Sequence, residues 1–542
     1  MHTYFKVRKP QNETVMSYLP GSPERKEVQS KLKELKSQTI EIPVIIGGKE
    51  IYTGNTKEFI IPHDKGHVLA IYHQAGEKEI KMAIQAALDA KAQWEALPWH
   101  HRLSIFLKAA ELLAGPWRQT LNAATMLGQS KTIFQAEIDS ACELIDFLRY
   151  NTYFLNQIYS DQPESSQASY NRMEYRPLEG FVLAVSPFNF TAIGGNLPTS
   201  PAMCGNVVLW KPSSTAVYSN YFFMKLLQEA GLPDGVINFI PGSGRVVGEH
   251  VFNDNNLAGI HFTGSTGVFS GMWKTIGDKI NEYKYYPRIV GETGGKDFIF
   301  AHPTADLASL NTAIVRGAFE YQGQKCSAAS RAYIPQSLWG KLEPMLKEDI
   351  ATIKMGDPED FTNFMTAVID QNSFDKIKSY IDYAREANDA EIICGGSCDD
   401  SKGFFIEPTV IKTTNPKFKS MVDEIFGPVM TIFVYEDTDL DETLELCNKG
   451  SAYALTGAIF AQDRTALVHM EQKLTHAAGN FYLNDKPTGA VVGQQPFGGG
   501  RASGTNDKAG SKLNLLRWLN ARTIKETFAP PTDYRYPFMQ ED

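Results

Sequence analysis

The chain has 542 residues, of which 43% are hydrophobic and 21% charged, and its formal net charge is −9 with an isoelectric point near 5.8. A chain longer than roughly 250–300 residues exceeds what a single core accommodates, so two or more domains are expected. The acidic balance without a long basic run argues against nucleic-acid binding, and no apolar run reaches the roughly 18 residues needed for membrane insertion.

The first 170 residues predict short strands followed by helices. Residues 40–46 are typical of one strand, and Pro43 within it indicates an edge position because proline cannot donate to a ladder. Residues 78–128 show helical periodicity, and a further apolar helix is expected over residues 133–156. The polar stretch 160–171 breaks this periodicity and predicts a loop or an extended hairpin that leaves the main body.

From Gly180 the pattern changes to short apolar strands separated by helices. The expected strands are residues 181–185, 207–210, 236–240 and 259–262. A helix over residues 218–230 is expected to end at Gly231, and a second α/β region to run from about residue 297 to residue 481. Strands that alternate with helices indicate parallel sheets. The predicted fold is therefore α/β, with two α/β domains and a projecting arm.

A cysteine in a polar turn is the strongest candidate for chemistry. Cys326 lies in residues 320–327, which are poor core residues, and Lys325 beside it could lower the thiol pKa. Glu292 lies 34 positions earlier on a glycine-rich bend. A thiolate can attack an electrophilic carbon and a carboxylate can activate water, so the pair suits acyl transfer. From the residues alone, a buried structural cysteine and a solvated carboxylate remain alternatives.

A third candidate follows the strand at residues 181–185. Asn189 could stabilise a developing oxyanion through its amide, although an ordinary turn residue is the alternative. Cys394 and Cys398 have no partner cluster of Cys or His, so a surface turn is expected there and no metal site.

Two glycine-containing turns suggest a nucleotide. Residues 241–249 follow a strand and place Gly244 and Gly248 in a G-x-G-x-x-x-G spacing, one residue longer than the common dinucleotide fingerprint. Residues 262–267 offer a second such turn, where phosphate oxygens could reach backbone N–H groups. Lys211, at the end of a strand, could supply a cation for a ribose or phosphate. Plain turn glycines and a solvated lysine remain open alternatives.

Together these motifs resemble the aldehyde dehydrogenase superfamily from about residue 40 to the C-terminus. They are Ser186-Pro187-Phe188-Asn189, Lys211-Pro212-Ser213, Phe262-Thr263-Gly264-Ser265, Glu292-Thr293-Gly294-Gly295-Lys296, Gly323-Gln324-Lys325-Cys326 and Glu424-Ile425-Phe426-Gly427-Pro428. Within the superfamily, residues 186–197, 319–328 and 493–508 look most like the subfamily that oxidises L-glutamate γ-semialdehyde, and residues 21–25 also look like that subfamily.

The resemblance implies a Rossmann-type NAD-binding domain, an α/β catalytic domain and a small oligomerisation arm. The implied ranges are an N-terminal arm at 1–39, cofactor binding at 40–155 and 181–292, catalysis at 293–490, and the oligomerisation arm and C-terminal tail at 156–180 and 505–542. It implies NAD-dependent oxidation of the semialdehyde to L-glutamate in proline catabolism. In this reaction, Cys326 forms a thiohemiacetal, Asn189 holds the oxyanion, and Glu292 activates the water that hydrolyses the thioester.

The resemblance also implies the contacts to cofactor and substrate. The implied cofactor residues are Ser186, Phe188, Lys211, Ser213, Ser214, Gly244, Gly248, Gly264, Ser265, Glu424 and Phe426. The implied substrate residues are Phe190, Lys325, Ser327, Gly489, Ala490 and Phe497. Two positions depart from the family pattern. Ala490 replaces a serine found in some relatives, so altered anchoring is expected. Ser214 stands where many NAD-preferring relatives carry an acid, so weaker NADP use is also expected.

The arm implies at least a homodimer, because exposed strand edges are normally covered. No region is large enough for a proline-oxidising domain, so a separate proline dehydrogenase is the expected metabolic neighbour. The N-terminus lacks a secretory or transit signal, and six sparse cysteines indicate free thiols in a reducing compartment. We therefore expect a cytoplasmic protein, or one of the mitochondrial matrix if the source is a eukaryote.

The sequence leaves three alternatives to this function. The chain could oxidise another aldehyde, such as succinic or aminoadipic semialdehyde, but the anchoring loop argues against this. It could release the acyl group to CoA, but Glu292 favours water. It could be an idle binding protein on the same fold, but such a protein could lose Cys326 or Glu292 freely, and the chain keeps both.

Overall fold

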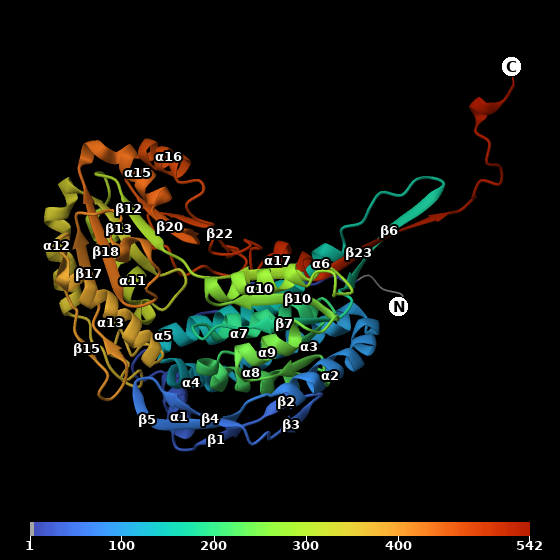
Figure 1. Ribbon diagram of the computed structural model, residues 1–542, viewed down its shortest axis with the longest axis horizontal. Helices are drawn as coiled ribbons and strands as arrows, with labels where there is room; N and C mark the ends of the chain where they lie inside the picture. The colour runs from blue at the N-terminus through green and yellow to red at the C-terminus, as the bar shows by residue number, and fades with distance from the viewer. Residues whose placement is uncertain (1–4, 542) are drawn as a thin grey trace.

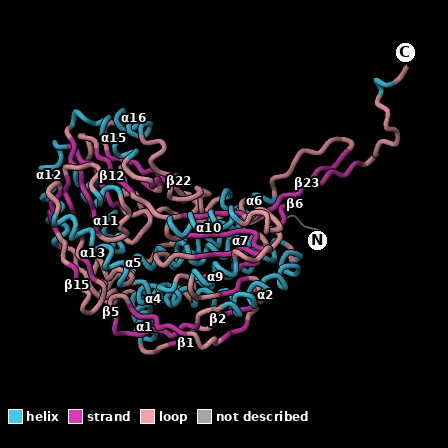
Figure 2. Tube along the Cα trace, viewed as in Figure 1, coloured by secondary structure: helices cyan, strands magenta, loops and turns pink. Residues whose placement is uncertain are grey.

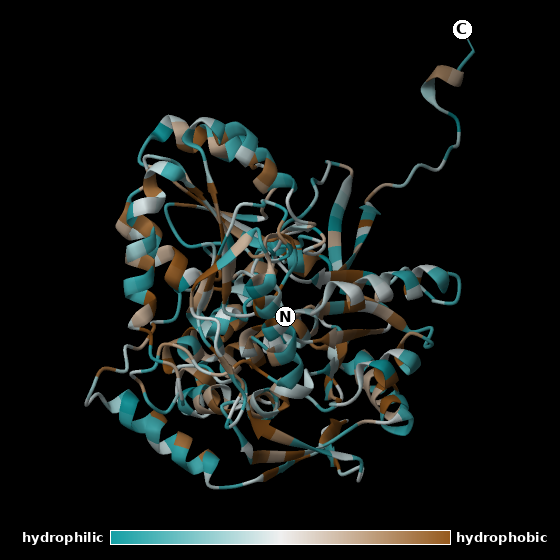
Figure 3. Cartoon of the chain, turned by 60° about the vertical axis from the view of Figure 1, so that its left-hand side comes forward, coloured by the Kyte–Doolittle hydropathy of each residue, from teal (hydrophilic) through white to brown (hydrophobic). Residues whose placement is uncertain are grey.

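The computed structural model describes residues 5–541. Figure 1 shows two α/β bodies beside each other, with a two-stranded arm and the C-terminal tail projecting from one of them. Strands lie inside each body and helices cover them (Figure 2). The inner strands are largely hydrophobic, whereas the outer helices expose many hydrophilic residues (Figure 3). Among the described residues, no helix is long and apolar enough to cross a membrane.

The first body is built on a seven-stranded sheet with the order β11-β10-β7-β8-β9-β2-β3. Its strands are β2 (Val44–Ile46), β3 (Lys49–Ile51), β7 (Phe181–Val185), β8 (Val207–Lys211), β9 (Ile237–Phe239), β10 (Leu257–Thr263) and β11 (Arg288–Glu292). The five strands from β7 to β11 pair in parallel, so their carboxyl ends meet at one edge. This confirms the predicted parallel sheet. Ligands bind at such an edge in open α/β sheets.

Helices pack on this sheet and on one another. They are α1 (Pro23–Lys36), α2 (Glu77–Ala96), α3 (Trp99–Ala114), α4 (Arg118–Gln129), α5 (Ile133–Ala136), α6 (Leu144–Tyr159), α7 (Thr191–Met203), α8 (Val217–Ala230), α9 (Gly244–Val251) and α10 (Thr266–Asp278). Helix α8 ends where predicted, because Gly231 adopts a left-handed conformation with φ of 95°. Between α5 and α6 the helix widens into a π-helical segment, Glu137–Glu143.

The second body has its own seven-stranded sheet with the order β14-β17-β18-β13-β12-β20-β21. Its strands are β12 (Asp297–Ala301), β13 (Ala329–Pro335), β14 (Ala390–Cys394), β17 (Thr409–Thr413), β18 (Val429–Tyr435), β20 (Thr456–Phe460) and β21 (Asn480–Leu483). Its helices are α11 (Leu307–Phe319), α12 (Gln336–Ala351), α13 (Gln371–Glu386), α14 (Lys419–Val422), α15 (Leu440–Lys449) and α16 (Arg464–Lys473). All strand pairs in this sheet are parallel except β14 with β17, at one edge.

Residues 40–46 were predicted to form one strand. They form two strands that belong to different sheets. Pro43 separates β1 (Ile40–Ile42) from β2, which pairs with β3 and β9 in the first sheet. Strand β1 is the edge of a three-stranded sheet with β4 (Thr56–Ile61) and β5 (Asp64–His73). Because proline cannot donate to a ladder, it stands where the chain leaves one sheet for the next.

The projecting arm is a two-stranded antiparallel sheet. Its strands, β6 (Ser169–Pro177) and β23 (Leu519–Thr527), come from distant parts of the chain and pair along nine residues each. Residues 161–168 form a loop, which was one of the two expectations for this stretch. The alternative, a hairpin, is not formed, because β6 pairs with a strand from the C-terminal part of the chain. The smaller elements are β15 (Cys398–Asp399), β16 (Phe405–Ile406), β19 (Tyr453–Ala454), β22 (Gly500–Arg501) and α17 (Lys512–Leu516). Residues 1–4 and 542, which belong to the predicted arm and tail, lie outside the described residues.

Candidate active site

The loop that carries Cys326 has an unusual backbone. After α11, Tyr321, Gln322 and Gly323 have φ angles of 52°, 54° and 63°, a left-handed conformation that residues other than glycine rarely adopt. The Gln322 side chain holds this loop by donating to the carbonyl oxygens of Ser130 and Ala367, at 3.0 and 2.8 Å. The loop is therefore fixed by contacts from both bodies.

Glu292 ends β11, at the carboxyl edge of the first sheet, and the bend after it packs directly on the Cys326 loop. A Cβ placed on Gly295 would lie 2.2 Å from the Cys326 carbonyl oxygen, and one on Gly294 would lie 2.2 Å from the Glu424 carboxylate. Only glycine fits either position. The structure therefore brings the predicted thiol and the predicted base together.

Asn189 follows β7 and faces the same loop. Its side chain is buried, and its amide Nδ2 donates to the carbonyl oxygen of Gln324 at 3.1 Å, two residues before Cys326. The second amide proton has no acceptor among the described residues. It is available to a ligand oxygen at the thiol.

The protonation of the site follows from its burial. Burial, and after it the Glu292 carboxylate, raises the pKa of the Cys326 thiol well above its usual range. Burial also raises the pKa of Glu292 to about 8, although nearby Lys508 opposes this shift. Glu292 Oε1 is buried and has no hydrogen-bond partner among the described residues. A group in this state can accept a proton near neutral pH.

The prediction that Lys325 lowers the thiol pKa is wrong. The ammonium of Lys325 forms an ion pair with Glu320 at 3.3 Å instead. Burial lowers the pKa of Lys325 to about 8, which leaves the ammonium mostly charged near neutral pH and paired with Glu320. Adjacency in sequence does not bring the two functional groups together.

A cavity of about 250 Å³ opens beside the thiol. Among the residues that line it are Cys326 and all six predicted substrate residues: Phe190, Lys325, Ser327, Gly489, Ala490 and Phe497. The Ser327 hydroxyl lies 2.8 Å from the Thr488 hydroxyl. The rings of Phe190 and Phe497, polar groups and the thiol thus line the same cavity.

The predicted cofactor residues lie at the carboxyl ends of the parallel strands. Lys211 is the last residue of β8, and burial lowers its pKa to about 8. Its ammonium makes no hydrogen bond or ion pair to a described residue. Ser265 precedes α10 without a side-chain cap, and Gly244 opens α9, where a Cβ would meet nothing within 4 Å. An unpartnered, half-buried cation and an open helix start suit a dinucleotide.

Two predicted cofactor residues come from the second body. Glu424 accepts a hydrogen bond from the Gly295 N–H at 2.9 Å, and burial raises its pKa. The ring of Phe426 meets the ring of Phe188 edge-on, with centroids 5.8 Å apart. The remaining predicted cofactor residues are Ser186, Ser213, Ser214, Gly248 and Gly264. They occupy the turns after β7, β8, β9 and β10, with Gly248 inside α9.

Sequence reasoning missed several charged residues buried beside the cavity. Lys131 forms an ion pair with Asp139 at 2.7 Å, and its ammonium lies 4.0 Å from the centre of the Phe190 ring. Glu143 lines the cavity, and burial raises its pKa well above its usual range. The spacing of Asp139, Glu143 and Asp146 was the available signal, because residues three or four apart lie on one face of a helix.

A sequence model described as the aldehyde dehydrogenase family matches residues 52–524. The chain belongs to the aldehyde dehydrogenase family. It is 56% identical over 533 residues to a mitochondrial delta-1-pyrroline-5-carboxylate dehydrogenase from Dictyostelium discoideum, covering 98% of this chain and 96% of that relative.

Solved structures agree with this family assignment. A delta-pyrroline-5-carboxylate dehydrogenase from Mycobacterium tuberculosis, bound with NAD, superposes with a TM-score of 0.97 at 49% identity and covers both chains completely. Proline utilization A from Bdellovibrio bacteriovorus gives a TM-score of 0.91 at 28% identity, over 96% of this chain and 54% of that chain. The α/β fold predicted from the sequence is thus confirmed as that of an aldehyde dehydrogenase.

The bend at Gly295 gives a first test of this aldehyde dehydrogenase site. A Cβ there would also lie 2.4 Å from the Asp297 carboxylate, so Gly295→Ala must displace the bend or the Cys326 loop. We expect kcat to fall about 100-fold, because a shift of about 1 Å costs that much in a catalytic site. Gly271→Ala in α10, where a Cβ meets nothing within 4 Å, should keep full activity. Equal rates of NADH formation by the two variants would contradict this packing.

Proposed function

We propose that this aldehyde dehydrogenase oxidises L-glutamate γ-semialdehyde, formed from Δ1-pyrroline-5-carboxylate, to L-glutamate in proline catabolism, with NAD as its cofactor. One observation carries the proposal: a single cavity holds Cys326 together with polar groups suited to an amino-acid head and two aromatic rings suited to a short aliphatic chain. The relatives that bear the name delta-1-pyrroline-5-carboxylate dehydrogenase match over nearly the whole chain.

The first half of the reaction takes place at Cys326. Its thiolate attacks the aldehyde carbon, and the carbonyl oxygen becomes the oxyanion of a thiohemiacetal. The free amide proton of Asn189 and the Cys326 backbone N–H stabilise that oxyanion. When bound, NAD supplies a positively charged nicotinamide ring that favours the thiolate and accepts the hydride.

The second half requires water. The Glu292 carboxylate removes a proton from a water molecule, and the resulting nucleophile attacks the thioester on Cys326 to release the acid. The unpartnered Oε1 of Glu292 is the atom that accepts the proton. Its pKa of about 8 makes proton transfer from water easier than it would be for an ordinary carboxylate.

The substrate is held at both ends of its aliphatic chain. The Ser327 hydroxyl and the backbone N–H groups at Gly489 and Ala490 anchor the α-carboxylate, and Lys325 contributes positive charge to the same wall of the cavity. Phe190 and Phe497 enclose the methylene groups. Ala490 retains its backbone N–H, so the missing serine hydroxyl alters this anchor without removing it.

The residues that would hold NAD lie along the carboxyl edge of the first sheet and in the second body. Lys211 would bind the adenosine ribose, Ser265 the pyrophosphate and Glu424 the nicotinamide ribose. The surrounding turns that complete this site contain Ser186, Phe188, Ser213, Ser214, Gly244, Gly248, Gly264 and Phe426. Residues 40–155 and 181–292 then form the cofactor domain, and residues 293–490 the catalytic domain.

The exposed Ser214 should allow some use of NADP, because it places no negative charge near a ribose 2′-phosphate. We expect kcat/KM for NADP to be measurable but below that for NAD. Introducing a carboxylate in Ser214→Glu should lower kcat/KM for NADP roughly tenfold by charge repulsion, with little change for NAD. Initial rates with each cofactor test this. An equal fall with both cofactors would mean that Ser214 does not face the 2′ position.

The paired strands β6 and β23 form an arm that joins two copies of the chain, because each strand leaves one edge unpaired among the described residues. A homodimer or a larger homo-oligomer is the result. The chain matches 54% of the proline utilization A chain, which supports a functional link to a proline dehydrogenase. The enzyme works in the cytoplasm, or in the mitochondrial matrix if the source is a eukaryote. In support, the name of the Dictyostelium relative calls that protein mitochondrial.

A substrate panel tests the proposed function. NADH formation is followed by absorbance with Δ1-pyrroline-5-carboxylate, succinic semialdehyde and aminoadipic semialdehyde. The highest kcat/KM is expected for the first compound, and a higher value for either of the others would overturn the substrate assignment. Formation of an acyl-CoA when CoA is added would instead overturn the role of water.

A further inference from the structure

Asn12, near the start of the chain, uses every polar group of its side-chain amide. Its Nδ2 donates to Asp146 Oδ2 at 2.8 Å and to the carbonyl oxygen of Val492 at 2.7 Å. Its Oδ1 accepts from Gln494 Nε2 at 2.9 Å and from the Tyr150 hydroxyl at 3.3 Å. Two of these partners belong to α6 and two to the loop after Gly489, so one amide links the helix to the loop.

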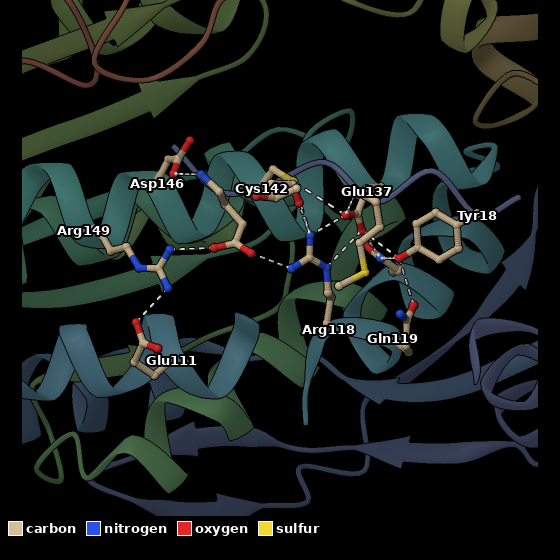
Figure 4. A network of polar contacts seen from close by, with 12 residues as sticks. Tyr18, Glu111, Arg118, Gln119, Glu137, Cys142, Asp146 and Arg149 are labelled. Atoms are coloured by element: carbon tan, nitrogen blue, oxygen red, sulfur yellow. Dashed lines mark hydrogen bonds and ion pairs between the residues drawn. The ribbon is translucent and has the colours of Figure 1, made fainter. Parts of the chain in front are cut away.

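The segment that carries Asn12 is itself held firmly by a buried ionic network (Figure 4). Glu13 lies between two guanidinium groups, with Arg118 at 2.8 Å and Arg149 at 2.6 Å. Arg118 also pairs with Glu137 in the π-helical segment, and Glu137 accepts from the Tyr18 hydroxyl at 2.8 Å. These ion pairs of Glu13 fix the backbone next to Asn12.

The segment and the loop form facing parts of the substrate cavity. Asn12, Glu13 and Val15 line it, as do the residues from Gly489 to Val492. The loop lies close against α6 beside Asn12, because a Cβ on Gly493 would lie 2.3 Å from the Tyr150 ring. The loop contains two glycines with positive φ, 97° at Gly489 and 81° at Gly493, and it closes on itself through hydrogen bonds from the Gln494 and Gln495 N–H groups to the Val491 carbonyl oxygen. The bonds from Asn12 add a support from outside the loop.

We propose that Asn12 is a positioning residue that fixes the loop of residues 489–495, so that its backbone N–H groups point at the head of the substrate. This inference rests on the proposed function, because it assigns Gly489 and Ala490 to the α-carboxylate. Asn12 acts through the loop and makes no contact with the reacting carbon. Its loss therefore weakens the binding of substrates with an amino-acid head and leaves the chemical step unchanged.

The test compares Asn12→Ala with Gln11→Ala, the neighbouring exposed residue, for which no side-chain hydrogen bond is found among the described residues. We expect Asn12→Ala to raise KM for Δ1-pyrroline-5-carboxylate about tenfold, with kcat and the KM for NAD within about twofold of the wild type. With propanal, which lacks the head, kcat/KM should stay unchanged. Gln11→Ala should behave as the wild type with both aldehydes.

Gln494→Ala provides a second variant that leaves the N-terminal segment intact and removes one support from the loop side. A smaller rise in KM for Δ1-pyrroline-5-carboxylate, again without an effect on propanal, supports the inference. An unchanged KM in both variants, or an equal loss with propanal, overturns it. If the wild type oxidises propanal but not Δ1-pyrroline-5-carboxylate, the proposed function has failed, which is a different result from failure of the positioning role.

Discussion

Glu292→Gln will slow multiple turnover by roughly 10²–10⁴-fold and still release a first equivalent of NADH. The amide cannot accept a proton from water, so the thioester on Cys326 forms but is hydrolysed slowly. Rapid-mixing measurements of NADH absorbance separate the initial burst from the steady state. Intact-protein mass spectrometry of the same sample should show the acyl group on the enzyme.

The pH dependence gives an independent check on Glu292. Its carboxyl must be ionised to act as a base, and its pKa is raised to about 8. Activity in the wild type should therefore rise with pH between about 7 and 9 and level off above that range, and Glu292→Gln should lack this limb. If the variant loses the burst together with steady-state turnover, Glu292 acts before the thioester forms. That result would contradict its assignment to hydrolysis.

Cys326→Ala will abolish NADH formation from every aldehyde, with a loss of at least about 10⁴-fold, because the other thiol that lines the cavity, Cys142, is held by Arg118 and Glu137 and cannot replace it. Binding of NAD should be unaffected, since the thiol makes no part of the proposed ribose or phosphate contacts. Steady-state rates and a fluorescence titration with NADH measure the two effects.

Cys398→Ala is the matched control, because Cys398 is a half-buried free thiol in the short strand β15 and outside the residues that line the cavity. It should keep wild-type activity. Substantial aldehyde oxidation by Cys326→Ala would contradict the covalent route. Loss of NADH binding in the same variant would instead mean that the substitution disturbs the cofactor site.

Local sequence patterns were sufficient to predict much of the fold. The strands before Asn189 and Lys211 are short apolar runs bounded by turn residues, and Gly231 ends α8 because glycine tolerates a positive φ. Cys326 and Glu292 could be predicted because their neighbours are glycine or polar residues that suit a tight loop better than a core. The structure packs these two loops together, as the motifs indicated.

Features that depend on distant contacts could not be predicted from local patterns. Lys325 precedes Cys326 in sequence, but its ammonium turns to Glu320, so the expected effect on the thiol is absent. The role of Asn12 depends on Val492, 480 positions away, and no periodicity encodes such a pairing. Pro43 indicates a strand edge because proline cannot donate to a ladder, but no local pattern shows that two sheets meet there.

The most direct test of the central claim is the stoichiometry of product formation from Δ1-pyrroline-5-carboxylate and NAD. L-Glutamate is quantified by chromatography in the same samples in which NADH is measured by absorbance, with Cys326→Ala as the blank. The account predicts one L-glutamate for each NADH in the wild type and neither product in the blank. NADH without L-glutamate, or no NADH from this substrate, would contradict it.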